Sequence, residues 1–164
     1  MQNPGVLLHQ GDRFSMSLKA TIQADMKTAL KGGEKERLSV IRMLLAAIQS
    51  SEIETRAELS DADVMQIVEK LIKQRKDSAK QFADVGRAER ATQELAEAQI
   101  LQGYLPEQLS PAELDALLTE VIAATGATSM KDMGKVMAEL RARAQGRADM
   151  GALSGRVKSR LAGS

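Results

Sequence analysis

The sequence contains no cysteine and no tryptophan, and its 164 residues include only one histidine. Without cysteine the chain forms no disulfide, no thiolate metal site, no iron–sulfur cluster and no cysteine nucleophile. A chain without disulfides suits a reducing compartment, so we expect a cytoplasmic location. The aromatic residues are limited to Phe14, Phe82 and Tyr104. The core must therefore be built from smaller side chains.

The single histidine, His9, lies within the first 15 residues, where no helical pattern is present. We interpret residues 1–15 as a disordered leader or an appended segment, because their apolar run is too short for a signal peptide or a membrane span. A catalytic or metal-binding histidine needs rigid supporting groups, which such a leader does not supply. We therefore predict no catalytic residue, no metal, no cofactor and no membrane association.

The abundant residues favour helices. The chain has 24 alanines and 9 methionines, whereas the β-branched and aromatic residues typical of strands are scarce. Apolar residues recur at intervals of three and four, and no alternating pattern persists. We predict an all-α fold of about seven helices. The helices are expected to run approximately from Ser17 to Lys31, Glu34 to Thr55, Ser60 to Gly86, Arg87 to Tyr104, Ser110 to Gly126, Ser129 to Gly146 and Asp149 to Leu161.

Pro106 to Ser110 is predicted to join two units. Pro106 stops the fourth helix, and Ser110-Pro111-Ala112-Glu113 combines an N-cap serine, a proline in the first turn and a capping-box glutamate. We expect an N-terminal four-helix unit over residues 16–106 and a C-terminal three-helix unit over residues 107–164, each folding separately.

Charge is balanced in the whole chain but not along it. The 23 basic and 22 acidic side chains leave a net charge of +1, which favours no class of partner. From Gly126 onward, however, eight basic residues face three acidic ones. This excess indicates either a phosphate-binding surface or an ordinary solvated helix face. If it binds RNA, the candidate residues are Lys135, Arg143, Arg147, Arg156 and Arg160.

Three other patterns have both a structural and a functional interpretation. The run Lys73–Lys80 is expected to extend past the core as a solvent face, with nucleic-acid contact as the alternative. Met130, Met133 and Met137 are expected to pack in the core, the alternative being a groove for a partner. Glu94, Glu97 and Glu107 are expected to be exposed, the alternative being a general acid–base pair.

Several longer motifs occur together in one order, at Arg37–Met43, Lys73–Ser78, Tyr104–Leu109, Asp132–Met137 and Gly146–Asp149. With these motifs the chain resembles the YqeY-like family over residues 17–162. That family is similar in its C-terminal part to the tail of GatB, a subunit of the glutamine-dependent amidotransferase that acts on misacylated Asp-tRNA or Glu-tRNA. The matching positions are Gly134–Met137, Gly146–Ala148 and Val157–Leu161.

The resemblance implies a helical module that binds tRNA or a component of the amidotransferase or aminoacylation machinery. A carbon–nitrogen ligase activity with glutamine as amido donor is implied only by association, because the catalytic part of the amidotransferase subunit has no counterpart here. The alternative is a protein-interaction module with no RNA or enzymatic role.

We predict that the purified chain does not transfer amide groups, because no nucleophile–base arrangement is present in its sequence. Incubation with glutamine, ATP and Glu-tRNA should yield no Gln-tRNA above the background of a protein-free reaction. Turnover that persists in preparations shown to lack contaminating amidotransferase would contradict this prediction.

Overall fold

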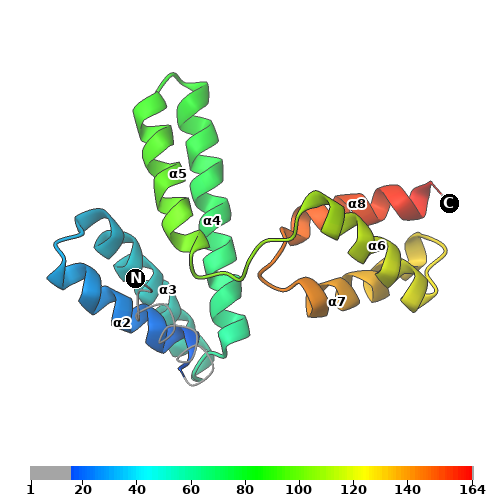
Figure 1. The fold of residues 1–164 in the computed structure, drawn as a ribbon, viewed down its shortest axis with the longest axis horizontal. Coiled ribbons are helices and arrows are strands. Elements are labelled where there is room, and N and C mark those ends of the chain that lie inside the picture. Colours follow the sequence, from blue (N-terminus) through cyan, green and yellow to red (C-terminus); the bar gives the residue numbers. More distant parts are fainter. Residues whose placement is uncertain (1–15, 164) are drawn as a thin grey trace, which may run out of the picture. The chain divides into compact units, whose positions relative to one another are not determined.

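The computed structural model describes residues 16–163 (Figure 1). Within this range the chain forms seven α-helices and one 3-10 turn, with no strand, which confirms the predicted all-α fold. The predicted leader over residues 1–15, including His9, lies outside the described residues. The helices are α2 (Leu18–Lys31), α3 (Lys35–Thr55), α4 (Asp61–Asp84), α5 (Ala88–Gln102), α6 (Pro111–Thr125), α7 (Met133–Ala144) and α8 (Met150–Ala162), and the turn η1 (Met130–Asp132) precedes α7.

The chain divides into two compact units, with the boundary between Tyr104 and Leu105. The first unit consists of two helical hairpins, in which α2 packs on α3 and α4 packs on α5 (Figure 1). Helix α3 contacts both helices of the second hairpin. The fully buried side chains of this unit are aliphatic, as the shortage of aromatics requires: Ile22, Ile41, Leu44, Ile48, Val64, Val68 and Leu101.

Polar contacts connect the helices of the first unit. Lys19 of α2 lies 2.6 Å from Glu52 of α3, whose carboxylate also accepts a hydrogen bond from the Leu59 backbone before α4. The Lys19 contact lowers the pKa of Glu52. Tyr104 donates a 2.8 Å hydrogen bond to Asp25 of α2, which connects the end of this unit to its first helix. Burial, followed by this hydrogen bond, raises the pKa of the Tyr104 hydroxyl.

Two expectations about the second hairpin are wrong. The second half of α4 does not extend beyond the packed part of the unit, because α5 runs alongside it and buries Ala79 (Figure 1). Leu95, one of the apolar positions from which the sequence predicts the fourth helix and therefore expected in the core, is 51% exposed. Small side chains at Ala91 and Ala98 occupy the buried face of α5 instead, and alanines allow the two helices to approach closely.

The second unit packs α6, α7 and α8 around a core of its own. Its buried residues include Leu118, Val121, Val136, Leu140, Leu153, Val157 and Leu161, all at most 3% exposed. Met133 and Met137 pack against this core as expected, but Met130 is 42% exposed, so its predicted core role is wrong. Met130 falls in the 3-10 turn, where the helical spacing that predicted its burial does not apply.

No helix within residues 16–163 is long and apolar enough to cross a membrane.

We predict that residues 105–164 fold without the rest of the chain, because their core is closed by their own three helices. The isolated fragment should give a helical circular-dichroism spectrum and a cooperative thermal transition. In the same fragment Leu140→Ala should cost about 2–5 kcal/mol by opening a cavity in this core. A wild-type fragment with the spectrum of an unfolded chain would refute separate folding.

Candidate nucleic-acid interface

Two of the five candidate residues, Arg156 and Arg160, are brought together on α8. Arg156 Nη1 and Arg160 Nη2 lie 3.3 Å and 3.5 Å from the same Oδ1 atom of Asp115 on α6. Arg160 Nη1 also donates a 2.6 Å hydrogen bond to the Thr119 hydroxyl. The arginine side chains remain 43% and 35% exposed. We call Arg156 and Arg160 the arginine pair.

The other three candidates have separate partners. Arg143 contacts Glu139 at 2.8 Å and Glu120 at 3.0 Å, and the hydrogen bond to Glu139 is the main cause of its raised pKa. Lys135 lies 4.0 Å from Asp132, and Arg147 Nε donates to the Glu107 carbonyl at 3.0 Å. Among the described residues, only the arginine pair shares a partner within the candidate set.

The surface of the second unit is less positive than the basic segment after Gly126 suggests, because carboxylates from α6 lie beside these basic side chains. Asp115 and Glu120 belong to α6, which precedes the basic segment that begins at Gly126. Residues 105–164 contain eight basic and seven acidic side chains in total. Each exposed ion pair contributes no more than about 1 kcal/mol, so an incoming phosphate competes with these carboxylates at small cost.

Sequence reasoning did not select Lys131, Arg141 and Lys158 as site residues, yet all three are exposed. Within residues 16–163 none of them forms an ion pair, in contrast to Arg143, Arg156 and Arg160. It also missed Thr119, whose role depends on α6 lying beside α8. Spacing along one helix carries no information about such a neighbour.

A pocket of about 460 Å³ lies beside the arginine pair. Apolar groups form most of its wall, and Arg160, Thr119 and Thr128 are the lining residues with polar side chains. The lining contains no carboxylate or imidazole, so it offers no general acid or base. The lining residues are Thr119, Ile122, Ala123, Gly126, Ala127, Thr128, Arg160 and Leu161.

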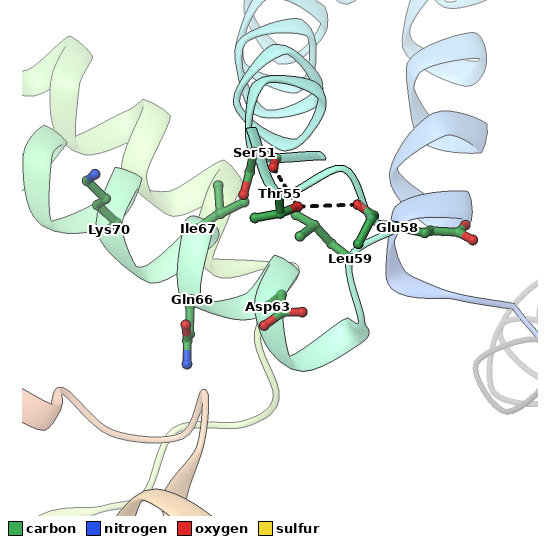
Figure 2. Close-up of a pocket in the computed structure, with 9 residues that line it drawn as sticks. Ser51, Thr55, Glu58, Leu59, Asp63, Gln66, Ile67 and Lys70 are labelled. Atoms are coloured by element: carbon green, nitrogen blue, oxygen red, sulfur yellow. Dashed lines mark hydrogen bonds between the residues drawn. The ribbon is translucent and has the colours of Figure 1, made fainter. Parts of the chain in front are cut away.

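A second pocket, of about 370 Å³, lies in the first unit where α3 leads into α4 (Figure 2). Its polar groups already serve the local backbone: Thr55 donates to the Ser51 carbonyl at 2.8 Å, and Asp63 accepts from the Ser60 backbone and hydroxyl in a capping box. Figure 2 shows Glu58, Gln66 and Lys70 pointing in different directions rather than toward one point. This pocket therefore lacks convergent reactive groups.

The predicted solvent face at Lys73–Lys80 contains one residue that turns inward. Arg75 lies between two carboxylates of α5, with Nη1 3.5 Å from Glu94 and Nε 3.3 Å from Glu97, and its Nη2 donates to the sulfur of Met43 on α3. We call Arg75, Glu94 and Glu97 the arginine–carboxylate cluster. Glu94 and Glu97 are therefore not the exposed residues expected from the sequence, with side chains only 15% and 20% exposed.

The arginine–carboxylate cluster joins helices and is not arranged as a catalytic acid–base pair. Both carboxylates are held by the same guanidinium, while Glu107 belongs to the other unit. Arg75 Nε and Glu94 Oε2 are buried and lack a well-aligned hydrogen bond. Burial, the largest cause, and repulsion from Glu94 and Glu36 raise the pKa of Glu97, which Arg75 partly offsets. Within residues 16–163 no group of three or more His, Cys, Asp or Glu side chains is placed to hold a metal ion.

Comparison with known proteins identifies similar chains. A family model described as "Yqey-like protein" matches residues 19–161. "Altered inheritance of mitochondria protein 41, mitochondrial" from Lachancea thermotolerans is 32% identical over 123 residues, covering 71% of this chain and 66% of the relative. The protein of that name from Pyrenophora tritici-repentis is 28% identical over 128 residues, covering 75% and 71%. These names state no chemical activity.

The raised pKa of Glu97 predicts a pH-dependent stability. The folded chain holds the Glu97 proton more tightly than the unfolded chain. The free energy of unfolding therefore falls as the pH rises from the ordinary pKa of a glutamate through the raised pKa of Glu97 in the folded chain. Glu97→Gln should remove this loss, so the stability of the variant relative to the wild type should increase as the pH rises above about 4, the ordinary pKa of a glutamate. Urea unfolding at several pH values measures this difference.

Glu89→Gln is the control, because it removes the same charge from an exposed position of the same helix. Glu89 lies in the first turn, where its charge favours the helix dipole, so this variant should lose stability relative to the wild type as the pH rises, opposite to Glu97→Gln. A Glu97→Gln chain that is less stable than the wild type by the same amount at every pH would contradict the prediction. In that case the contact of the carboxylate with Arg75 would outweigh the cost of burial.

Proposed function

Because the chain belongs to the YqeY-like family, we propose that it is a helical RNA-binding module that contacts tRNA, as an accessory to tRNA-dependent amidotransferase chemistry. The proposal is supported by the similarity of its C-terminal motifs to the tail of the amidotransferase subunit. It assigns tRNA contact to the second unit and no catalytic step to this chain.

The observation that carries the proposal is that two arginines share one carboxylate. Arg156 and Arg160 both contact Asp115, so two guanidinium groups lie close together at one place on the surface of the second unit. A guanidinium has five N–H donors, and Arg156 uses one of them on Asp115. The donors that remain match the oxygens of a phosphate, which arginine binds in a forked geometry.

RNA binding at this site requires the arginine pair to contact a phosphate in addition to Asp115 or in its place. An RNA phosphate adds to the arginine pair or displaces Asp115, and it releases the counterions condensed on the RNA. The pocket beside Arg160 adds an apolar wall next to the bound phosphate, which suits a ribose or base better than a free inorganic anion. Both features belong to α6, α8 and the residues that follow α6, all in the second unit, so the site does not depend on the first unit.

The compartment stays a prediction. The sequence favours a cytoplasmic protein, whereas the relatives quoted above carry the word mitochondrial in their names. A protein that serves tRNA-dependent chemistry is compatible with either location.

We predict that Arg156→Glu with Arg160→Glu weakens tRNA binding at least tenfold, or about 1.4 kcal/mol, because a repelled phosphate loses both contacts. Asp115→Asn should have the opposite effect and tighten binding about two- to fivefold, since it removes the carboxylate that competes with the phosphate. Filter binding with labelled, unfractionated tRNA measures both variants.

The control is Lys131→Glu with Lys158→Glu, which changes the charge of the same unit by the same amount at exposed positions outside the arginine pair. Equal losses in the two double variants would show that net charge alone governs binding and would refute the assigned site. Wild-type protein that binds no tRNA at low salt would favour the protein-interaction alternative.

A further inference from the structure

The basic run on α4 separates into one inward arginine and three outward lysines. At 3.6 residues per turn, Lys73, Lys76 and Lys80 fall within about 60° of the helix circumference. All three are exposed, whereas Arg75 points toward the carboxylates of α5. We call Lys73, Lys76 and Lys80 the lysine stripe, which extends about 10 Å along α4 at 1.5 Å per residue.

The lysine stripe has no partner in the described part of the chain. Within residues 16–163 none of its three ammonium groups forms a hydrogen bond or an ion pair. This distinguishes the stripe from the arginine pair, which shares Asp115. An incoming anion at the stripe therefore displaces no carboxylate of the protein.

Helix stability explains the stripe only in part. Asp77 lies four residues after Lys73 and three before Lys80, which favours the helix. Lysines at spacings of three and four residues, as at Lys73–Lys76 and Lys76–Lys80, repel each other on a helix. Cations stabilise a helix in its last turn, but the last turn of α4 contains no basic residue. At the beginning of α5, Arg87 occupies the N-cap position, where a positive charge opposes the helix dipole.

The hairpin around the stripe is nearly balanced in total charge. Residues 69–97 contain seven basic and six acidic side chains, and two of the acidic ones, Glu94 and Glu97, hold Arg75. The larger neighbours of the stripe on the same side of α4 are polar: Glu69, Lys70, Asp77, Gln81 and Asp84. A helix that inserts into a membrane surface places large apolar side chains beside its lysines, and this face has none.

We propose that the lysine stripe binds the phosphate backbone of RNA, as a second contact surface on the first unit. The choice of RNA as the polyanion rests on the proposed function. The stripe itself rests on its unpaired lysines and on the absence of large apolar neighbours. Lysine contacts phosphates as a point charge, so the stripe gives affinity without reading base sequence. Two surfaces on one chain increase affinity beyond that of either alone when one RNA reaches both.

The test compares two triple variants of the full chain in binding to labelled, unfractionated tRNA over a series of salt concentrations. The first is Lys73→Gln, Lys76→Gln and Lys80→Gln. The matched control is Lys27→Gln, Lys31→Gln and Lys35→Gln, which removes three exposed lysines from the same unit. One of these, Lys31, lies in the last turn of α2, where it offsets the helix dipole.

The stripe variant should lose at least tenfold in affinity at low salt. Its slope of log affinity against log salt should be shallower by about 2 to 2.7, at roughly 0.7–0.9 for each lost phosphate contact. The control should change both quantities by less than half as much. Circular dichroism should show the same helix content in all three proteins, since every replaced side chain is exposed.

The outcomes separate this proposal from the assignment of the arginine pair. If the stripe variant binds like the control while Arg156→Glu with Arg160→Glu weakens binding, the lysine stripe does not contact RNA and the proposed function is supported. If only the stripe variant weakens binding, the arginine pair does not contact RNA and the lysine stripe does. Wild-type protein that binds phosphatidylserine vesicles through these lysines but does not bind tRNA would overturn the stripe as an RNA contact.

Discussion

The contact of Arg75 with Glu94 and Glu97 organises the first unit and its surface. It places one guanidinium between α4 and α5 and reaches Met43 on α3, so a single side chain connects three helices. Because Arg75 turns inward, the lysines on either side of it turn outward. The same helical period that builds the hairpin therefore also produces an exposed row of positive charge.

The composition explains why this contact is needed. With few aromatic residues, the hairpin uses small buried side chains. The second half of α4 buries only Ala79, and α5 buries Ala91 and Ala98 beside Leu101. Alanines allow close packing but bury little apolar area each. The arginine–carboxylate cluster adds hydrogen-bonding and ionic contacts where the apolar area is small. Its cost is the burial of carboxylates, which is visible in the raised pKa of Glu97.

The basic side chains of the two units differ in whether a carboxylate is paired with them. In the second unit the arginines lie beside carboxylates of a neighbouring helix, so an RNA phosphate competes with Asp115. In the first unit no described carboxylate forms an ion pair with the lysine stripe, although Asp77 and Asp84 lie on the same side of α4. The arginine pair can bind a phosphate in a defined orientation through its forked guanidinium groups. The lysine stripe attracts phosphates over a longer range through its unpaired ammonium groups.

Local features of the fold were predictable from the sequence, and contacts between helices were not. The capping box at Ser110–Glu113 is confirmed because a cap depends on residues three positions apart. The exposure of Leu95 and the inward turn of Arg75 depend on which helix packs against which, and periodicity within one helix does not contain that information. The carboxylates of α6 were missed as partners of the arginines for the same reason.

The most direct test of the account is the salt dependence of tRNA binding by the unmodified full-length chain. Two arginines and three lysines in contact with phosphates predict a slope of log affinity against log salt of about −3.5 to −4.5. A slope near zero, or no binding at about 50 mM salt, would contradict the claim that this protein recognises RNA through its phosphates.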